Sequence, residues 1–234
     1  MTHKLKKGDY VSVDYTGKVG DAFFDTTQEE IAKKIGIFNS NTKYGPVTIR
    51  VGEGHILKGL DESLEDKDCD SKFSISLTPE KAFGKKDAKL IKLVPRSAFT
   101  RHNVNPQVGL QVTIDNGTAT IRSIAGGRIL VDYNHPLAGK TVHYDVQIHK
   151  ILTDPKKQMQ TVLSREFQIS ENVYKVKFTG SNATLMFSTG PIPEPLAKVI
   201  NDRIIVCVPS IKKVECTFEK SKGNDTSQEI EKSE

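Results

Sequence analysis

The chain has few of the features that mark secreted, metal-binding or membrane proteins. Its three cysteines, Cys69, Cys207 and Cys216, are odd in number and include no CxxC pair. We therefore expect free thiols in a reducing compartment, not a disulfide framework. The first residues, Met-Thr-His-Lys-Leu-Lys-Lys-Gly, lack the apolar stretch of a signal peptide. No run approaches the roughly 18 apolar residues of a membrane span, so we expect a soluble, cytoplasmic protein without a membrane partner.

The excess of positive charge is confined to one segment. Between residues 85 and 137 there are eight lysines or arginines and three aspartates, an excess that equals the net charge of +5 for the whole chain. A nucleic-acid surface is one explanation of this charge. The segment lacks interleaved aromatic residues and any known nucleic-acid-binding motif, however, so a solvated basic surface is the expectation.

The histidines are too dispersed to predict a metal site. His143 and His149 share one face of a predicted strand, but six residues of strand separate them by about 20 Å. One ion cannot bind both side chains across that distance. We expect neither a metal nor a cofactor.

Residues 51–64 predict a short helix with an apolar stripe and too many glycines. Gly52 and Gly54 suit a tight turn at its start. Gly59 lies mid-helix, where a missing side chain costs about 1 kcal/mol relative to alanine, so a close approach by other backbone is the expected reason for it. Four apolar residues at helical spacing share one face: Ile56, Leu57, Leu60 and Leu64.

Alternating patterns around this helix predict an antiparallel sheet able to curl over it. Apolar and polar residues alternate as in half-buried strands over four segments: 9–19, 47–51, 73–77 and 142–148. Residues 22–25 are predicted to return as a second short strand. A small extra helix is predicted over 27–35. Thr27 and Glu30 have capping-box spacing, and Gly36 follows as the stop.

The pattern changes between residues 85 and 137. One helical turn is predicted at 95–99, followed by a three-stranded meander over 112–114, 119–121 and 129–133. The glycine-containing pairs Asn116-Gly117 and Gly126-Gly127 are typical of the two hairpin turns. This segment has enough apolar residues for a small core of its own and is interpreted as a separate module.

A third block begins at residue 154. Its periodicities follow the order α-β-β-α-β, which predicts a small two-layer α+β domain over 154–220. Residues 221–234 contain almost no recurring apolar positions and are expected to be disordered.

Five motifs in this order resemble the FKBP-type peptidyl-prolyl isomerases: Val13-Asp-Tyr15-Thr-Gly17, Phe24-Asp25, Gly54-His-Ile-Leu-Lys-Gly-Leu60, Pro79-Glu-Lys-Ala-Phe-Gly84 and Val142-His-Tyr-Asp-Val146. The segment ending Asn134-His-Pro-Leu-Ala-Gly139 is similar to the insert-in-flap domain of the SlyD-like branch. The helix at 27–35 and the C-terminal block resemble the long-type archaeal members. Residues 7–152 carry the motifs, whereas the likeness of the C-terminal block rests on position and element order.

The resemblance implies an α+β fold, an antiparallel half-barrel wrapped on one short helix. The isomerase domain would comprise residues 1–84 and 138–153, interrupted by a mainly-β chaperone insert at 85–137. The C-terminal α+β domain would follow at 154–220. By analogy with long-type members, this last domain would mediate homodimerisation.

The implied activity is rotation of the bond between any residue X and proline. Amide resonance gives that bond a barrier of roughly 18–20 kcal/mol, and no nucleophile or metal is needed to lower it. A dry apolar pocket favours the twisted transition state, which has lost much of its charge separation. Carried over residue by residue, the implied pocket consists of Tyr15, Phe24, Asp25, Val47, Ile56, Leu57, Leu60, Phe83 and Tyr144.

Two positions depart from the commonest family pattern. Leu60 stands where many members have tryptophan, and Phe83 where a tyrosine hydroxyl usually bonds a substrate carbonyl. One lost neutral hydrogen bond is worth about 0.5–1.5 kcal/mol, so weaker binding or slower turnover is expected. Asp25 would be the polar member, held by Tyr15 and facing the rotating carbonyl carbon or a neighbouring N–H.

Two functions remain open on the sequence. In the first, an isomerase with chaperone activity, the insert holds unfolded, proline-containing polypeptides beside the pocket. In the second, a non-catalytic chaperone or partner-binding protein retains a degenerate pocket. In either case, the apolar residues expected to contact clients are Leu93, Val94, Phe99, Leu110, Val112 and Leu137.

Overall fold

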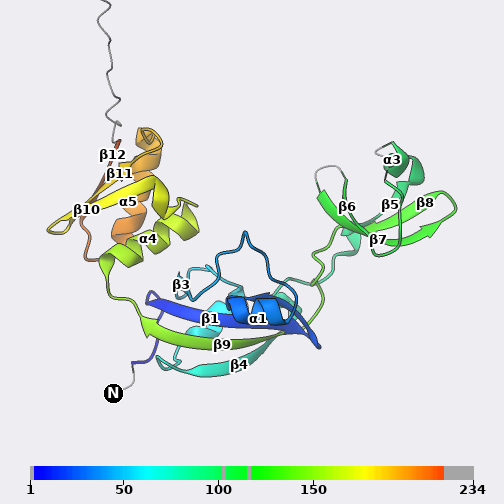
Figure 1. Ribbon diagram of the computed structural model, residues 1–234, viewed down its shortest axis with the longest axis horizontal. Helices are drawn as coiled ribbons and strands as arrows, with labels where there is room; N and C mark the ends of the chain where they lie inside the picture. The colour runs from blue at the N-terminus through cyan, green and yellow to red at the C-terminus, as the bar shows by residue number, and fades with distance from the viewer. Residues whose placement is uncertain (1–2, 102–103, 115–116, 219–234) are drawn as a thin grey trace, which may run out of the picture. The chain divides into compact units, whose positions relative to one another are not determined.

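The computed structural model describes residues 3–101, 104–114 and 117–218 (Figure 1). The chain forms two compact units. The first contains residues 1–7, 12–47 and 51–150, and the second contains residues 8–11, 48–50 and 151–234. Within the described ranges, no helix is long and apolar enough to cross a membrane.

A mixed α+β arrangement with antiparallel pairing forms the first unit. Its main sheet has the strand order β2-β1-β9-β4, with β3 paired to β1. The strands are β1 (Tyr10–Val19), β2 (Ala22–Thr26), β3 (Val47–Arg50), β4 (Lys72–Leu77) and β9 (Val142–Ile151). The late strand β9 lies between β1 and β4, and Tyr144 on β9 faces Ile75 on β4. The chain thus returns to this sheet after a long excursion, as the sequence pattern predicted.

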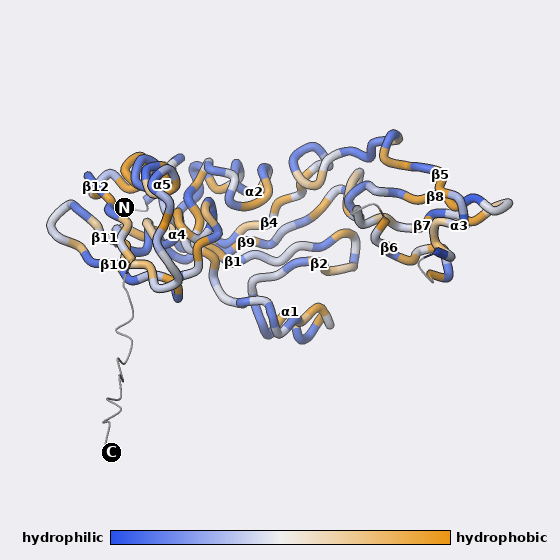
Figure 2. Tube along the Cα trace, turned by 90° about the horizontal axis from the view of Figure 1, so that it is seen from above, coloured by the Kyte–Doolittle hydropathy of each residue, from blue (hydrophilic) through white to orange (hydrophobic). Residues whose placement is uncertain are grey.

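Two short helices cover opposite faces of this sheet (Figure 2). α1 (Glu29–Lys34) lies on the face that carries Asp14 and Thr16, which we call the back face. α2 (Lys58–Leu64) lies on the other, inward face.

α2 begins later than the sequence predicted. Residues 51–56 form turns, in which Gly52 and Gly54 adopt φ angles of +82° and +70°. The Asp61 carboxylate accepts hydrogen bonds from the backbone N–H groups of both glycines, at 2.9 Å and 2.8 Å. Asp61 is 4% exposed, so this carboxylate is buried together with the turn. The tight turn predicted at these glycines is confirmed, but its carboxylate anchor was not predicted.

Gly59 is required by a close approach, as predicted. A Cβ atom at this position would lie 2.9 Å from the backbone carbonyl oxygen of Lys81 and 2.7 Å from Leu77 Cδ2. The 3₁₀ helix η1 (Pro79–Lys81) therefore packs directly on the backbone of α2. Phe83 follows two residues after the end of η1.

The predicted capping box of α1 is wrong. Gln28 is the N-cap residue, and no side-chain cap is found among the described residues. The Thr27 hydroxyl instead donates to Asp14 and accepts from the backbone N–H of Tyr15. Gly36, with a φ of +75°, follows the last turn at the predicted stop.

The insert forms a sheet with the order β5-β8-β7-β6. Its elements are η2 (Ala88–Leu90), β5 (Ile91–Pro95), α3 (Arg96–Thr100), β6 (Gln111–Ile114), β7 (Gly117–Ala125) and β8 (Arg128–Asp132). The predicted three-stranded meander is thus corrected to four strands, because β5 pairs with β8. Asn116 of the first predicted hairpin turn lies outside the described residues. Phe99, Ile121, Ile129 and Val131 form the centre of a core within the insert.

The second unit contains the predicted α-β-β-α-β order. Its elements are α4 (Pro155–Glu166), η3 (Glu171–Val173), β10 (Tyr174–Thr179), β11 (Asn182–Phe187), α5 (Glu194–Cys207) and β12 (Lys213–Phe218). β11 pairs antiparallel to β10 and parallel to β12. Arg203 on α5 forms an ion pair with Glu166 at the end of α4, so the two helices are joined by charge as well as by the core.

Residues from the start of the chain belong to this second unit. Tyr10 lies in its core, and the Tyr10 hydroxyl donates to the carbonyl oxygen of Cys207 at 3.3 Å. The backbone N–H of Leu152 donates to the Tyr10 carbonyl at 2.7 Å, and the Arg50 guanidinium lies over the Tyr10 ring. The domain boundaries predicted at residues 84/85, 137/138 and 153/154 stay predictions, and the predicted disordered tail at 221–234 lies outside the described residues.

Candidate functional site

Four aromatic side chains form a chain of edge-to-face contacts in the first unit. We call Tyr15, Phe24, Phe83 and Tyr144 the aromatic cluster. Tyr144 meets both Tyr15 and Phe24 with ring centroids 5.8 Å apart, and Phe24 meets Phe83 at 5.7 Å. Edge-to-face geometry is favoured because the positive ring edge points at the negative face. Residues far apart in sequence thus build one aromatic surface.

Gly17 makes room for this arrangement. A Cβ atom on Gly17 would lie 2.8 Å from Phe24 Cζ and 2.8 Å from Tyr144 Cε1. The φ angle of Gly17 is not positive, so the requirement is for space and not for a special backbone conformation. Gly17 follows Tyr15 on the same face of β1, because side chains alternate along a strand.

Asp25 is the acidic residue of the predicted pocket. Burial raises the pKa of its carboxyl group, and a hydrogen bond from the Thr26 backbone opposes this rise. Burial also raises the pKa of the Tyr144 hydroxyl, and the nearby charges of Asp25 and Tyr15 raise it further. The Tyr144 hydroxyl therefore stays protonated at neutral pH and is available as a hydrogen-bond donor.

The structure joins five of the nine predicted pocket residues through ring contacts or charge: Tyr15, Phe24, Asp25, Phe83 and Tyr144. The other four lie between Asp25 and Phe83 in the sequence. Val47 is half-buried at the start of β3, and Ile56 and Leu57 are half-buried just before α2. Leu60 lies inside α2 and is 1% exposed. Assignment of all nine to one proline pocket stays a prediction.

His135 adds a contact that the sequence analysis missed. Its imidazole stacks on the Phe83 ring with centroids 4.5 Å apart and planes within 1° of parallel. The two residues are 52 positions apart, on opposite sides of the insert. The quoted motif from Asn134 to Gly139 contained His135, but nothing in its spacing indicated an aromatic partner.

The ends of the insert are tied together around His135. The Asn134 side chain donates to the Asp87 carbonyl oxygen at 3.0 Å and accepts from the Asp87 backbone N–H at 2.8 Å. The Gly139 N–H donates to the Gly84 carbonyl oxygen at 2.8 Å. The ends at Gly84 and Gly139 are therefore adjacent without any help from the imidazole.

Asp132 anchors the same region from the end of β8. It is 4% exposed and accepts hydrogen bonds from Arg122 and Asn134. Burial alone would raise the pKa of Asp132, but these hydrogen bonds hold the pKa below the usual value. A buried charge with this many donors is an expected structural anchor.

The predicted client-contacting residues differ in exposure. Leu93 is 61% exposed and Leu110 is also exposed, whereas Val94 and Leu137 are half-buried. Phe99, at 2% exposure, and Val112 belong to the core of the insert, so the expectation that they face clients is corrected. Apolar residues had been selected by type, and type does not distinguish the inner face of a small sheet from its rim. The structure adds three exposed side chains that were not selected: Leu90, Val108 and Ile124.

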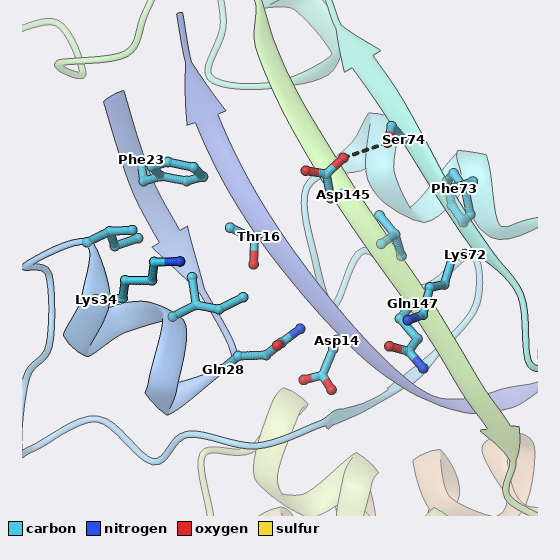
Figure 3. Close-up of a pocket in the computed structure, with 13 residues that line it drawn as sticks. Asp14, Thr16, Phe23, Gln28, Lys34, Lys72, Phe73, Ser74, Asp145 and Gln147 are labelled. Carbon is cyan, nitrogen blue, oxygen red and sulfur yellow. Dashed lines mark hydrogen bonds between the residues drawn. The ribbon is translucent and has the colours of Figure 1, made fainter. Parts of the chain in front are cut away.

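A separate groove lies on the back face of the main sheet (Figure 3). It has a volume of about 670 Å³ and runs between α1 and strands β1, β4 and β9; none of the nine predicted pocket residues lines it. Two of its acidic side chains already have partners, since Asp14 pairs with His149 and Thr27, and Asp145 with Ser74. The hydrogen bond from Thr27 to Asp14 holds the segment that precedes α1 against β1.

The histidines considered for a metal site have other partners. His149 Nε2 lies 2.7 Å from Asp14 Oδ2, and His143 Nδ1 lies 2.7 Å from Ser76 Oγ. Across the described part of the chain, no group of three or more potential metal ligands occurs.

Comparisons with known proteins place these observations in a family. Residues 92–137 match the family model described as "FKBP26, IF domain". The chain is 30% identical over 151 residues to a "Short-type peptidyl-prolyl cis-trans isomerase" of Methanocaldococcus jannaschii, covering 64% of this chain and 96% of that protein. It is 32% identical over 156 residues to the "FKBP-type 16 kDa peptidyl-prolyl cis-trans isomerase" of Escherichia coli K12, with the same coverage.

A third relative is the "FKBP-type peptidyl-prolyl cis-trans isomerase SlyD" of Treponema pallidum, which is 31% identical over 134 residues and is covered to 76%. All three relatives are peptidyl-prolyl cis-trans isomerases, the family that the sequence motifs resemble. Two of them are matched over nearly their full length. The chain belongs to the family of FKBP-type peptidyl-prolyl cis-trans isomerases.

Proposed function

We propose that the aromatic cluster and the residues that lead into α2 bind the proline of an X-Pro segment and accelerate its cis-trans rotation. The observation that carries the proposal is that Phe24 and Tyr144 meet above Gly17, with Phe83 packed edge-to-face on Phe24. The twisted amide has less charge separation than the planar one, so apolar rings stabilise the transition state more than the ground state. The reaction needs no nucleophile, and none is assigned.

Asp25 supplies the polar element in this proposal. It follows Phe24 directly, and its charge is close enough to influence the Tyr144 hydroxyl. A partly buried carboxylate facing the rotating group would interact with the amide whose polarity changes during rotation. Full isomerase activity of Asp25→Ala would remove this role.

The decisive test of the proposed activity is exchange spectroscopy on a short peptide. Cis-trans exchange of a blocked Ala-Leu-Pro-Phe peptide is measured by NMR with catalytic amounts of the chain. Acceleration supports an active pocket, and Leu60→Asp should abolish it while circular dichroism reports whether the fold persists. No acceleration by the wild-type chain would favour the alternative of a non-catalytic binding protein.

We further propose that the insert holds unfolded clients through its exposed apolar residues. Leu93, Val108 and Leu110 are exposed, whereas the core of the insert is formed by other side chains. A contiguous patch of exposed apolar side chains is typical of a binding surface, and the proposal takes these three residues to belong to one. Val94 and Leu137, which are half-buried, would contribute at its margin.

Removal of residues 85–137 tests the role of the insert. The hydrogen bond between Gly84 and Gly139 shows that a short linker can bridge the gap. On the tetrapeptide the deletion should lose no more activity than His135→Phe, because His135 is removed with the insert. On an unfolded protein whose refolding is limited by prolyl isomerisation, the deletion should lose additional activity. A matched substitution, Leu93→Ser with Leu110→Ser, should weaken client binding without unfolding the insert. Undiminished activity of the deletion variant on the unfolded protein would contradict the proposal.

We also propose that the second unit mediates homodimerisation through α5, as in long-type members of the family. Val199 and Val206 on this helix are 55% and 63% exposed, and Leu196 is also exposed. Their spacing of three and seven residues places them on one helical face. Sedimentation should give a dimer for the wild-type chain and a monomer for Val199→Asp with Val206→Asp. A monomeric wild-type chain at tens of micromolar would refute the proposal.

A further inference from the structure

We propose that His135 donates a hydrogen bond from Nε2 to a backbone carbonyl oxygen of the bound peptide, beside the prolyl bond. This role rests on the proposed isomerase function and identifies a substrate-contacting residue for it. The inference begins with the chemistry of Phe83, a member of the aromatic cluster that has no hydrogen-bonding group.

The His135 imidazole contacts the aromatic cluster through Phe83. His135 stacks on Phe83 at 4.5 Å, and Phe83 meets Phe24 edge-to-face at 5.7 Å. His135 is exposed, so a ligand that covers the cluster can reach the edge of the imidazole. The parallel stack holds the ring plane while leaving its edge free to form hydrogen bonds in that plane.

The tautomer follows from the backbone. The Leu137 N–H donates to His135 Nδ1 at 3.1 Å, so Nδ1 carries a lone pair. In neutral imidazole the proton is then on Nε2, which becomes a donor. No hydrogen-bond partner for Nε2 occurs within the ranges that the structure describes. The ring therefore presents one oriented N–H group at the Phe83 end of the cluster.

A bound peptide needs a donor at this end. Transfer of a peptide carbonyl from water onto apolar rings is unfavourable unless the oxygen finds a hydrogen bond. The Tyr144 hydroxyl is separated from Phe83 by the Phe24 ring, with which both make edge contacts. Donation by His135 would satisfy a carbonyl that the Tyr144 end does not serve.

A purely architectural role for the ring is not required by the structure. Asn134 already joins the two ends of the insert through Asp87, and Gly139 bonds to Gly84. The stack on Phe83 therefore positions the imidazole itself.

The test is a double-mutant cycle on kcat/KM for the blocked Ala-Leu-Pro-Phe peptide. His135→Phe keeps a ring for stacking and removes the donor, while Phe83→Tyr supplies a hydroxyl next to the lost group. One neutral hydrogen bond corresponds to about 2- to 13-fold in a rate or binding constant, and H135F should lose activity within that range. F83Y should raise kcat/KM more in the H135F background, where the donor is missing, than in the wild-type background, where His135 already donates.

Rescue by the hydroxyl separates donation from structural support. The loss of the Leu137 hydrogen bond in H135F would not be repaired by a hydroxyl on residue 83. Full activity of H135F, or an equal effect of F83Y in both backgrounds, would overturn the role of His135. A wild-type chain that fails to accelerate exchange would instead remove the proposed function, and this inference with it. A second readout is the ¹⁵N resonance of His135 Nε2, which should shift on peptide binding in the wild-type chain.

Discussion

Replacement of Gly17 by alanine tests the aromatic cluster with the smallest change available. The added methyl group would lie 2.8 Å from both Phe24 Cζ and Tyr144 Cε1, which is 0.6 Å short of an ordinary 3.4 Å contact. Both atoms belong to rings in edge-to-face contact, so neither ring can withdraw without disturbing the other. Over-packing of this kind typically costs about 1–3 kcal/mol of stability.

The expected effect on activity follows from the displacement. A misplacement of 1 Å can cost about 100-fold in rate, so a shift of about 0.6 Å in two rings should lower kcat/KM about tenfold. Tenfold corresponds to about 1.4 kcal/mol of activation free energy. The assay is NMR exchange of the tetrapeptide at a temperature where both proteins are fully folded.

Gly20→Ala is the matched control. Gly20 has a φ of +55° and open space where the alanine Cβ would lie, so the substitution introduces backbone strain without a clash. The strain should cost about 1–2 kcal/mol of stability and leave kcat/KM unchanged. If G17A retained wild-type kcat/KM at equal folded fraction, Phe24 and Tyr144 would not be part of the reacting site.

Three further changes test the electrostatics and packing of the fold. Asp25→Asn should raise the free energy of unfolding at pH 7, because the wild-type chain loses stability as pH rises through the raised carboxyl pKa. The gain should vanish below the ordinary aspartate pKa of about 3.9, and pH-dependent urea unfolding of both proteins checks this sign. Asp61→Ala should cost at least about 2 kcal/mol in urea unfolding, because two backbone donors lose a charged acceptor; a loss near zero would contradict its anchoring role. Phe99→Ala should cost about 3–5 kcal/mol and expose the insert's amides to hydrogen exchange, whereas Leu93→Ala should leave their protection unchanged.

Periodicity predicted most of the elements because strand and helix spacing survives in the folded chain. The strands β1 and β9, the α-β-β-α-β order and the close approach at Gly59 are confirmed. The half-buried pattern predicted for β1 is wrong, because Ser12, Asp14 and Thr16 on its polar face are also buried. β5 was missed because Ile91, Leu93 and Val94 do not alternate and Pro95 follows them. Pairing with β8 determines that strand, and a partner so distant along the chain is not visible in a local pattern.

Competition for polar groups explains the remaining differences. Thr27 has the spacing of a cap, but the carboxylate of Asp14 on β1 takes its hydroxyl. Residues 51–64 were predicted as one helix, but the N–H groups of Gly52 and Gly54 bind the Asp61 carboxylate, and residues 51–56 form turns. His135 was overlooked because its partner Phe83 is brought close only by closure of the insert.

The contact between Tyr10 and Cys207 has a consequence for how the chain is made. The two residues are separated by 197 positions, yet the hydroxyl of one bonds the backbone of the other within a single core. A ribosome adds about 5–20 residues per second, so Tyr10 waits on the order of ten seconds or more before Cys207 is synthesised. Until then the Tyr10 side chain lacks part of the core in which it is buried. A nascent folding catalyst is, for those seconds, itself an incompletely folded protein.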